Sequence, residues 1–287
     1  MESFRITLAQ IAPVVMDVEK NMKRALSLLD DCAKRGSSIL VLPELYLSGY
    51  EIKEAISTEA GEERLKNDVD EALPLIAKKT RETGCDILVS YPLFDQPGKK
   101  PYIALEYFSD GKSLALHRKI NLCNYAQYTE HLIFSEGYDV TVAKTPCCNA
   151  GMFVCEDLWH MTNAIFAAKL GAEVLFYPSA ATVMDMADGE KCFSNWKKLT
   201  QGTAFSQTSY VVCCNQAASP DSVYFGGSHV VDPNGEIVGR LPLFEEAVMD
   251  VEIDMEYLRE IRRKRPLLRN ERFDVYKKIF DKSGSSL

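Results

Sequence analysis

Three residues whose types suit acyl-transfer chemistry each follow a stretch of strand-like sequence. They are Glu44 after residues 39–43, Lys119 after residues 114–118, and Cys155 after residues 150–154. A carboxylate, an ammonium and a thiol are the groups needed to attack a carbonyl carbon that is bonded to nitrogen. Because all three lie where a predicted strand ends, we expect them to share one site.

The order of events at such a site follows from the chemistry of each group. A thiol with a pKa of about 8.5 needs a base before it can act as a nucleophile at neutral pH, and Glu44 is the candidate base. The ammonium of Lys119 and the backbone N–H of Glu156 would stabilise the oxyanion of the tetrahedral intermediate. Cys155 would then carry a thioester, and Glu44 would activate the water that hydrolyses it.

Further motifs accompany these residues along the chain. They are Pro43-Glu44, Gly49-Tyr50, Arg118-Lys119-Ile120, then Tyr128, Glu130 and Phe134, then residues 177–180 and an Arg-rich segment that contains Pro266. This ordered set resembles the nitrilase superfamily of carbon–nitrogen hydrolases over nearly the whole chain. The resemblance implies an amidase with Glu44, Lys119 and Cys155 as a catalytic triad, and with no metal or organic cofactor.

The resemblance also gives expectations for residues around the triad. Glu130 is expected to position Lys119 or the substrate. Tyr50 and Trp159 either form walls of the substrate pocket or pack in the core. Ser179 and Ala180 either contact the substrate or close a strand beside the site.

The segment from Cys155 to Trp159 bears on the substrate. Its Cys-Glu-Asp-x-Trp order is similar to the glutaminase portion of glutamine-dependent NAD synthetases, but this sequence of 287 residues has no synthetase half. Two enzyme hypotheses follow: an amidase that acts on linear amides or carbamoyl compounds, and a glutaminase-like subunit that supplies ammonia to a separate partner. A third hypothesis, from another class, is a non-catalytic binding protein that has the same fold. Selectivity is expected to depend on the loops at residues 121–127 and 183–191.

Composition and charge narrow the class of protein and its partners. The chain is 46% hydrophobic and 26% charged, without a Pro-, Gly- or Ser-rich linker, so we expect one hydrolase domain over residues 1–287. The net charge of -8 disfavours nucleic acid and anionic membranes as partners. The four histidines lack a two-ligand motif, so no metal site is expected. The expected partner is a small-molecule amide.

The compartment can also be predicted. Residues 1–8 lack the basic and then apolar start of a signal peptide, and no apolar run reaches the roughly 18 residues of a membrane helix. Nine cysteines scattered through apolar segments suit buried thiols better than a disulfide framework. We therefore expect a cytoplasmic protein.

Hydrophobic periodicity predicts a mixture of strands and helices. The predicted helices cover residues 18–35, 62–83, 161–170 and 190–206. The predicted strands cover residues 4–11, 38–42, 86–91, 103–108, 114–118, 173–177, 210–215, 223–231, 237–241 and 247–251, with one more ending at Cys155. Two halves with similar element order favour two packed sheets with helices outside, which is the α+β, four-layer α-β-β-α sandwich that the resemblance implies.

The C-terminal segment, residues 266–287, has no place in the repeating sandwich. It nevertheless carries apolar side chains: Leu267, Leu268, Phe273, Tyr276 and Ile279. We expect this extension to lie at a subunit interface, in a homodimer or a higher even oligomer.

Overall fold

The strands form two six-stranded sheets in the computed structural model, which describes residues 2–126, 128–219 and 222–283. In spatial order, the first sheet contains β12 (Ala247–Asp254), β1 (Ser3–Gln10), β2 (Ile39–Val41), β3 (Asp86–Leu93), β4 (Tyr102–Ser109) and β5 (Lys112–Arg118). The second contains β11 (Ile237–Arg240), β10 (His229–Val231), β9 (Tyr210–Asn215), β8 (Val174–Ser179), β7 (Asn149–Met152) and β6 (Thr141–Lys144).

Both sheets are built on the same plan. The central strands β1, β2 and β3 pair in parallel, as do β7, β8 and β9, while the outer strands pair antiparallel. Parallel neighbours need a crossover, usually a helix. The crossovers here are α1 (Val18–Lys34), α2 (Glu59–Thr83), α3 (Met161–Lys169) and α4 (Gly189–Gln207).

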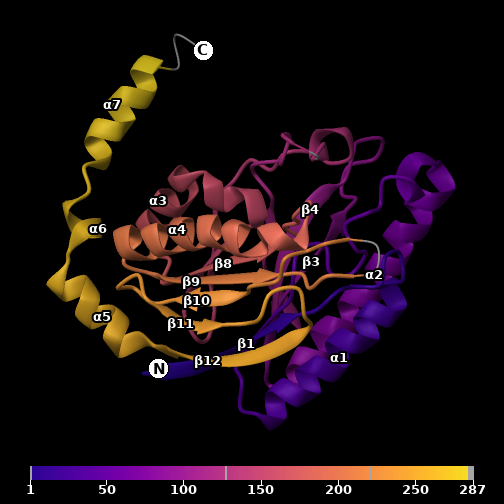
Figure 1. The fold of residues 1–287 in the computed structure, drawn as a ribbon, viewed down its shortest axis with the longest axis horizontal. Coiled ribbons are helices and arrows are strands. Elements are labelled where there is room, and N and C mark those ends of the chain that lie inside the picture. The colour runs from indigo at the N-terminus through magenta and orange to yellow at the C-terminus, as the bar shows by residue number, and fades with distance from the viewer. Residues whose placement is uncertain (1, 127, 220–221, 284–287) are drawn as a thin grey trace.

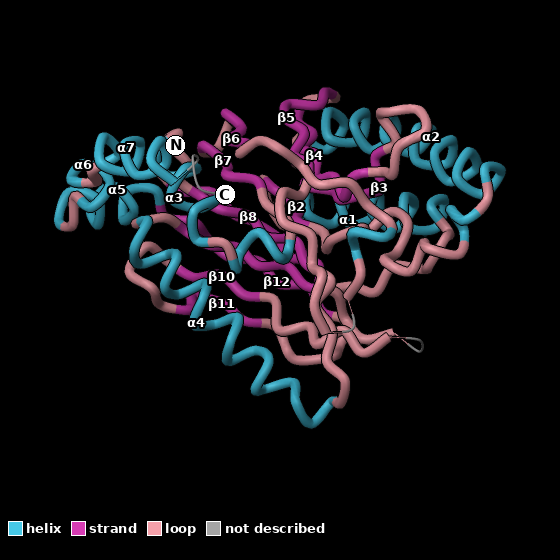
Figure 2. The backbone as a smooth tube through the Cα atoms, turned by 90° about the horizontal axis from the view of Figure 1, so that it is seen from above, coloured by secondary structure: helices cyan, strands magenta, loops and turns pink. Residues whose placement is uncertain are grey.

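The helices cover the outer faces of the two sheets. Figure 1 shows α3 and α4 on one side and α1 and α2 on the other, and Figure 2 shows the strands between these two groups. Alternation along β8 explains the layers, because successive strand residues point to opposite faces. Val174 and Phe176 belong to the core shared with the first sheet, whereas Leu175 and Tyr177 pack with residues of α3 and α4. The predicted four-layer sandwich is confirmed.

Some predicted elements differ from the structure. The strand predicted for residues 223–231 is only β10, because Gly226 and Gly227 adopt φ values of 65° and 64°, which a strand cannot contain. The strand expected to end at Cys155 ends at Met152. Strand β6 is not predicted by the sequence pattern.

Among the described residues, three helices follow β12. They are α5 (Met255–Lys264), α6 (Leu267–Asn270) and α7 (Phe273–Ser283). They run along one side of the sandwich and extend beyond the sheets (Figure 1). Residues 284–287 of the predicted extension lie outside the described residues. Within the described part of the chain, no helix combines the length and apolar character needed to cross a bilayer.

Candidate active site

Glu44 lies just after β2, and its carboxylate is fully buried. Its Oε1 atom accepts a hydrogen bond from Lys119 Nζ at 2.8 Å, and its Oε2 atom accepts one from the backbone N–H of Ala180 at 2.9 Å. Gln216 Nε2 donates to the Glu44 carbonyl oxygen at 2.9 Å. Groups from both sheets therefore hold this carboxylate in place.

Lys119 follows β5 and is also fully buried. Its Nζ atom lies 2.8 Å from Glu44 Oε1 and 2.8 Å from Glu130 Oε1. Burying an ammonium is costly unless close, well-oriented partners compensate for the lost hydration. Two carboxylates supply that compensation here.

Glu130 opens the short 3₁₀ helix η2 (Glu130–Leu132), and its two oxygens face different partners. Besides Lys119, Oε1 accepts a hydrogen bond from the Tyr50 hydroxyl at 2.6 Å, and Oε2 accepts one from the backbone N–H of Cys123 at 2.8 Å. Glu130 thus connects the lysine to the loop after it and to the segment that carries Tyr50.

Cys155 begins the 3₁₀ helix η3 (Cys155–Trp159), so the helix expected after the thiol is a short turn before α3. Cys155 adopts a φ of 45°, which is unusual for a residue with a side chain. Such backbone strain occurs mainly at functional sites and persists only when the surroundings hold it. The carboxylate of Asp157 provides part of that support by accepting a hydrogen bond from the Val154 N–H at 3.1 Å.

Asp157 also ties this turn to the end of β5, a role that the sequence reasoning missed. Asp157 Oδ1 accepts a hydrogen bond from the Asn121 N–H at 2.8 Å, and Oδ2 lies 3.2 Å from His117 Nε2. The side chains of Asp157 and His117 are fully buried. Asp157 thus links the Cys155 turn to the strand that precedes Lys119. The only signal in the sequence is the acidic pair that follows the cysteine.

The ionisable groups of the site perturb one another. Burial raises the pKa of Glu44 to about 7, against the opposing charge of Lys119. Burial and then the charge of Glu44 raise the pKa of the Cys155 thiol well above its ordinary value. Burial would lower the pKa of Lys119, but the carboxylates of Glu44 and Glu130 outweigh it and raise the pKa well above its usual range. The resting site therefore holds a protonated thiol, a charged lysine and a carboxyl group that titrates near neutrality.

A cavity of about 150 Å³ opens onto these groups. It is lined by Glu44, Tyr50, Cys123, Tyr125, Tyr128, Glu130, Cys155, Glu156, Trp159, Ala180, Ala181, Thr182, Cys192 and Trp196. Seven of the nine predicted site residues are in this set. Lys119 donates hydrogen bonds to Glu44 and Glu130, which line the cavity, although Lys119 itself is not among the lining residues. At ~30 Å³ per water molecule, this cavity has room for a small acyl group.

The remaining predicted residues have distinct surroundings. Ser179 is fully buried and is not among the lining residues; its hydroxyl donates to the Tyr177 carbonyl at 3.1 Å, and its own carbonyl accepts from the Glu44 N–H at 3.4 Å. Trp159 lines the cavity and meets Trp196 edge-on, with ring centroids 6.1 Å apart. Ser179 therefore acts on the position of Glu44, and Trp159 forms part of a cavity wall.

Two polar pairs that the sequence does not reveal hold lining residues of the cavity in position. The Tyr128 hydroxyl is 2.6 Å from Thr182 Oγ1 and accepts a hydrogen bond from the Thr182 N–H at 3.0 Å. Asn215 Oδ1 accepts from the Ala181 N–H at 2.8 Å, and Asn215 Nδ2 donates back to the Ala181 carbonyl at 3.2 Å. These hydrogen bonds hold Ala181 and Thr182, in the segment after β8, in position. Gln127, at the end of the predicted selectivity loop 121–127, lies outside the described residues.

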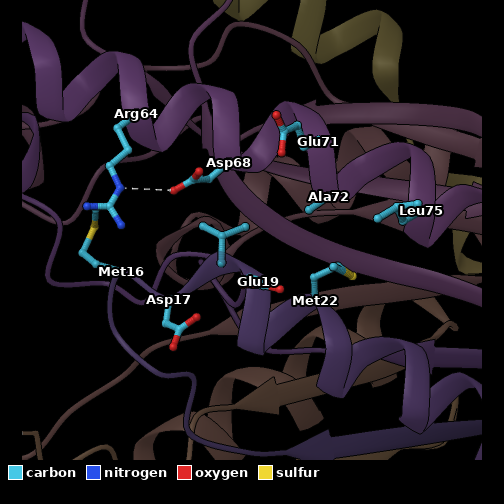
Figure 3. Close-up of a pocket in the computed structure, with 10 residues that line it drawn as sticks. Met16, Asp17, Glu19, Met22, Arg64, Asp68, Glu71, Ala72 and Leu75 are labelled. Carbon is cyan, nitrogen blue, oxygen red and sulfur yellow. Dashed lines mark ion pairs between the residues drawn. The ribbon is translucent and has the colours of Figure 1, made fainter.

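A larger cavity of about 580 Å³ lies between α1 and α2 (Figure 3). Its charged lining residues are Asp17, Glu19, Arg64, Asp68 and Glu71. Arg64 Nε lies 3.7 Å from Asp68 Oδ2 on the open surface of α2, with side chains that are 77% and 41% exposed. None of the predicted site residues lines this cavity.

Comparison with known proteins places the chain in a family. The family model for carbon–nitrogen hydrolases matches residues 5–263, so the chain belongs to that family. Helicobacter pylori carbon–nitrogen hydrolase has the same fold, with a TM-score of 0.86, 22% identity, and coverage of 97% of this chain and 98% of that one. The amidase of Nesterenkonia, a nitrilase-superfamily member, gives a TM-score of 0.80 at 21% identity over 97% of this chain and 98% of that one.

Two kinds of curated relative are similar in sequence. Omega-amidase NIT2 of Xenopus tropicalis is 30% identical, over 96% of this chain and 98% of the relative. Glutamine-dependent NAD(+) synthetase of Thermotoga maritima is 29% identical over 89% of this chain, and the chain spans only 43% of that enzyme. The protein is therefore an enzyme of the carbon–nitrogen hydrolase family, and of the two enzyme hypotheses the glutaminase-like subunit is the weaker one.

Proposed function

We propose that this protein hydrolyses a small linear carboxamide or carbamoyl compound through a thioester on Cys155, with release of ammonia or an amine. The observation that carries the proposal is the meeting of Glu44, Lys119 and Cys155 at one small cavity. The amidase relatives support a small amide as the substrate class.

In the first half-reaction, Cys155 is the nucleophile and Glu44 is the base. The thiol proton moves to the Glu44 carboxylate as sulfur bonds to the carbonyl carbon of the amide. The carbonyl oxygen becomes an oxyanion, which Lys119 Nζ and the Glu156 N–H stabilise. When the carbon–nitrogen bond breaks, Glu44 returns the proton to the departing nitrogen.

The second half-reaction reuses the same groups. Glu44 takes a proton from water as the water oxygen attacks the thioester carbon, and the same donors stabilise the second oxyanion. The carbon–sulfur bond then breaks, the carboxylic acid leaves, and the proton on Glu44 returns to Cys155. A pKa of about 7 suits Glu44 for both directions of transfer near neutral pH.

Residues around the triad position it and the substrate. Glu130 holds the ammonium of Lys119 toward the cavity. Tyr50 orients Glu130 through its hydroxyl, Trp159 forms a wall for the acyl chain, and Ala180 holds Glu44 through its backbone N–H.

The test is ammonia release over a panel of short amides, carbamoyl compounds, glutamine and nitriles. We expect turnover of at least one linear amide or carbamoyl compound and none of the nitriles. A silent panel at high concentration of folded enzyme would contradict the proposal. Turnover confined to glutamine would instead favour the glutaminase-like subunit, which the similarity to NAD(+) synthetase supports.

We further propose a cytoplasmic homodimer built from one hydrolase domain with a C-terminal extension. The exposed apolar side chains of α6 and α7 support the dimer, because Leu267 and Ile279 are 38% and 54% exposed. The nine free cysteines suit a reducing compartment. Light scattering that gives only the monomer mass of 32.2 kDa at micromolar concentration would contradict the dimer.

A further inference from the structure

We infer that Glu156 makes the substrate cavity selective for amides whose acyl chain ends in an amine, and that the cavity rejects amides whose chain ends in a carboxylate. The inference rests on the proposed function and adds the charge of the substrate to it. It depends on the side chain of Glu156, whereas the proposed mechanism uses only its backbone N–H.

The charges that line the cavity are all of one sign. Three carboxyl groups line it, from Glu44, Glu130 and Glu156, and no Lys, Arg or His side chain is among the described residues that do so. Lys119 lies beside the cavity, but its Nζ atom already contacts two of these carboxylates at 2.8 Å. A carboxylate on the substrate would therefore find no cation to pair with.

Glu156 is the carboxyl group that the catalytic cycle leaves unused. It is 5% exposed, and its Oε2 atom accepts a hydrogen bond from the Tyr125 hydroxyl at 2.9 Å. Burial raises its pKa, although hydrogen bonds from Tyr125 and Cys123 and the charges of Lys119 and His160 act against that shift. The imidazole of His160 lies 3.6 Å from Oε1, but His160 is 47% exposed and does not line the cavity. An ammonium that enters the cavity would place a positive charge beside Glu156 on the cavity side, where no cationic side chain is among the described lining residues.

The aromatic walls add to the same preference. Tyr50, Tyr128, Trp159 and Trp196 line the cavity, and the faces of aromatic rings attract cations. The tyrosine hydroxyls are already engaged: Tyr50 donates to Glu130, and Tyr128 is bonded to Thr182. Because these hydroxyls already have partners, they do not bind a substrate carboxylate in place of a cation. A carboxylate moved from water into this cavity would lose its hydration and face like charges, which is strongly unfavourable.

The experiment compares three amides of similar length that differ at the end of the chain. They are 4-aminobutanamide, pentanamide and succinamate, which end in an ammonium, a methyl group and a carboxylate. We expect kcat/KM to fall in that order, with a ratio of roughly 100-fold or more between 4-aminobutanamide and succinamate. Glutamine, which adds a carboxylate to 4-aminobutanamide, should be a poorer substrate than its decarboxylated form.

A Glu156→Gln variant tests whether this side chain sets the preference. The amide can still accept from Tyr125 but carries no charge, so the ratio between 4-aminobutanamide and succinamate should shrink by about 10-fold or more. Taking the ratio within each variant cancels any general loss of activity. Glu63→Gln removes the same charge from an exposed position on α2 and should leave the ratio unchanged.

A binding measurement separates this inference from the proposed function. Calorimetry with the Cys155→Ala variant, which lacks the nucleophile, should show tighter binding of 4-aminobutanamide than of succinamate. Equal or tighter binding of succinamate, or an unchanged ratio in Glu156→Gln, would overturn the inference. If the inference is overturned but the wild-type enzyme still hydrolyses pentanamide, the proposed function stands. A wild-type enzyme that releases ammonia from no amide would contradict the proposed function itself.

Discussion

The cavity between α1 and α2 and the cavity beside the triad each lie next to an ion pair. In the first, Arg64 and Asp68 form an ion pair at 3.7 Å, and both side chains remain in contact with water. In the second, Lys119 and Glu44 lie 2.8 Å apart with no exposure at all. Solvated pairs contribute about 0–1 kcal/mol, whereas a buried pair is costly to break because one charge is then left without a partner.

The difference shows that volume is a poor guide to chemistry here. The cavity of about 580 Å³ has the larger space, yet the cavity of about 150 Å³ has the buried charges and the shifted pKa values. Groups with perturbed pKa values gather at functional sites. Substitutions in both cavities test this comparison. Substitutions beside the triad should change activity and stability far more than substitutions between α1 and α2.

Loss of the nucleophile should have the largest effect. Cys155→Ala removes the sulfur on which the proposed thioester forms, so kcat should fall on the order of 10⁴-fold or more. Ammonia release and intact-protein mass spectrometry measure turnover and acylation. Cys147→Ala, a partly buried thiol outside the cavity, is the control and should retain activity. Wild-type turnover by folded Cys155→Ala would refute the mechanism.

Loss of the buried ammonium should come next. Lys119→Met should lower kcat by roughly 10²- to 10³-fold because one oxyanion donor is lost. It should also reduce the free energy of unfolding by about 3–5 kcal/mol, since Glu44 and Glu130 lose their shared partner. Ammonia release and urea unfolding measure the two effects. Lys112→Met, on the exposed start of the same strand, should change neither.

Titration of Glu44 should appear in the pH profile. Its pKa is raised to about 7, and only the deprotonated form can accept the thiol proton, so kcat/KM should fall as the pH drops through that value. The loss should approach tenfold per pH unit. Glu44→Gln should be slower by at least about 100-fold and should lack this limb. A wild-type profile that stays flat down to about two units below neutrality would argue against Glu44 as the base.

The smallest effect is expected in the larger cavity. Arg64→Ala removes an exposed ion pair between residues one helical turn apart, which is worth about 0.3–0.5 kcal/mol. Ammonia release should stay within about twofold of the wild-type rate, because the pair is solvated. A large loss of activity in this variant would break the comparison and point to a role for the cavity between α1 and α2.

Local patterns were sufficient for the elements that bury one regular face. In α1, the buried positions Val18, Met22, Ala25 and Leu29 recur every three to four residues, so the sequence predicts the helix almost to its ends. The region around Gly226 and Gly227 could not be predicted in the same way, because its apolar content resembles a strand while its backbone angles exclude one. Residue type alone does not reveal left-handed φ values.

The sequence predicts the reacting groups of the candidate site but not the residues that hold them in position. Glu44, Lys119 and Cys155 stand out because their types and positions at strand ends suit one reaction. The contacts of Asp157 with His117 and Asn121 join segments far apart in sequence, and they follow only from the packing of the two sheets. The same holds for the segment after β8, where Asn215 holds Ala181.

The pairing of β1 with β12 has a consequence for how the protein is made. Ser3 lies opposite Asp254 and Gln10 opposite Ala247, so the first strand obtains one of its two neighbours from near the other end of the chain. On the ribosome, that edge of β1 stays open until β12 has emerged. Open strand edges promote pairing with other chains, and contacts between distant segments form slowly. We therefore expect this edge of β1 to be open to pairing with other chains while the protein is being synthesised.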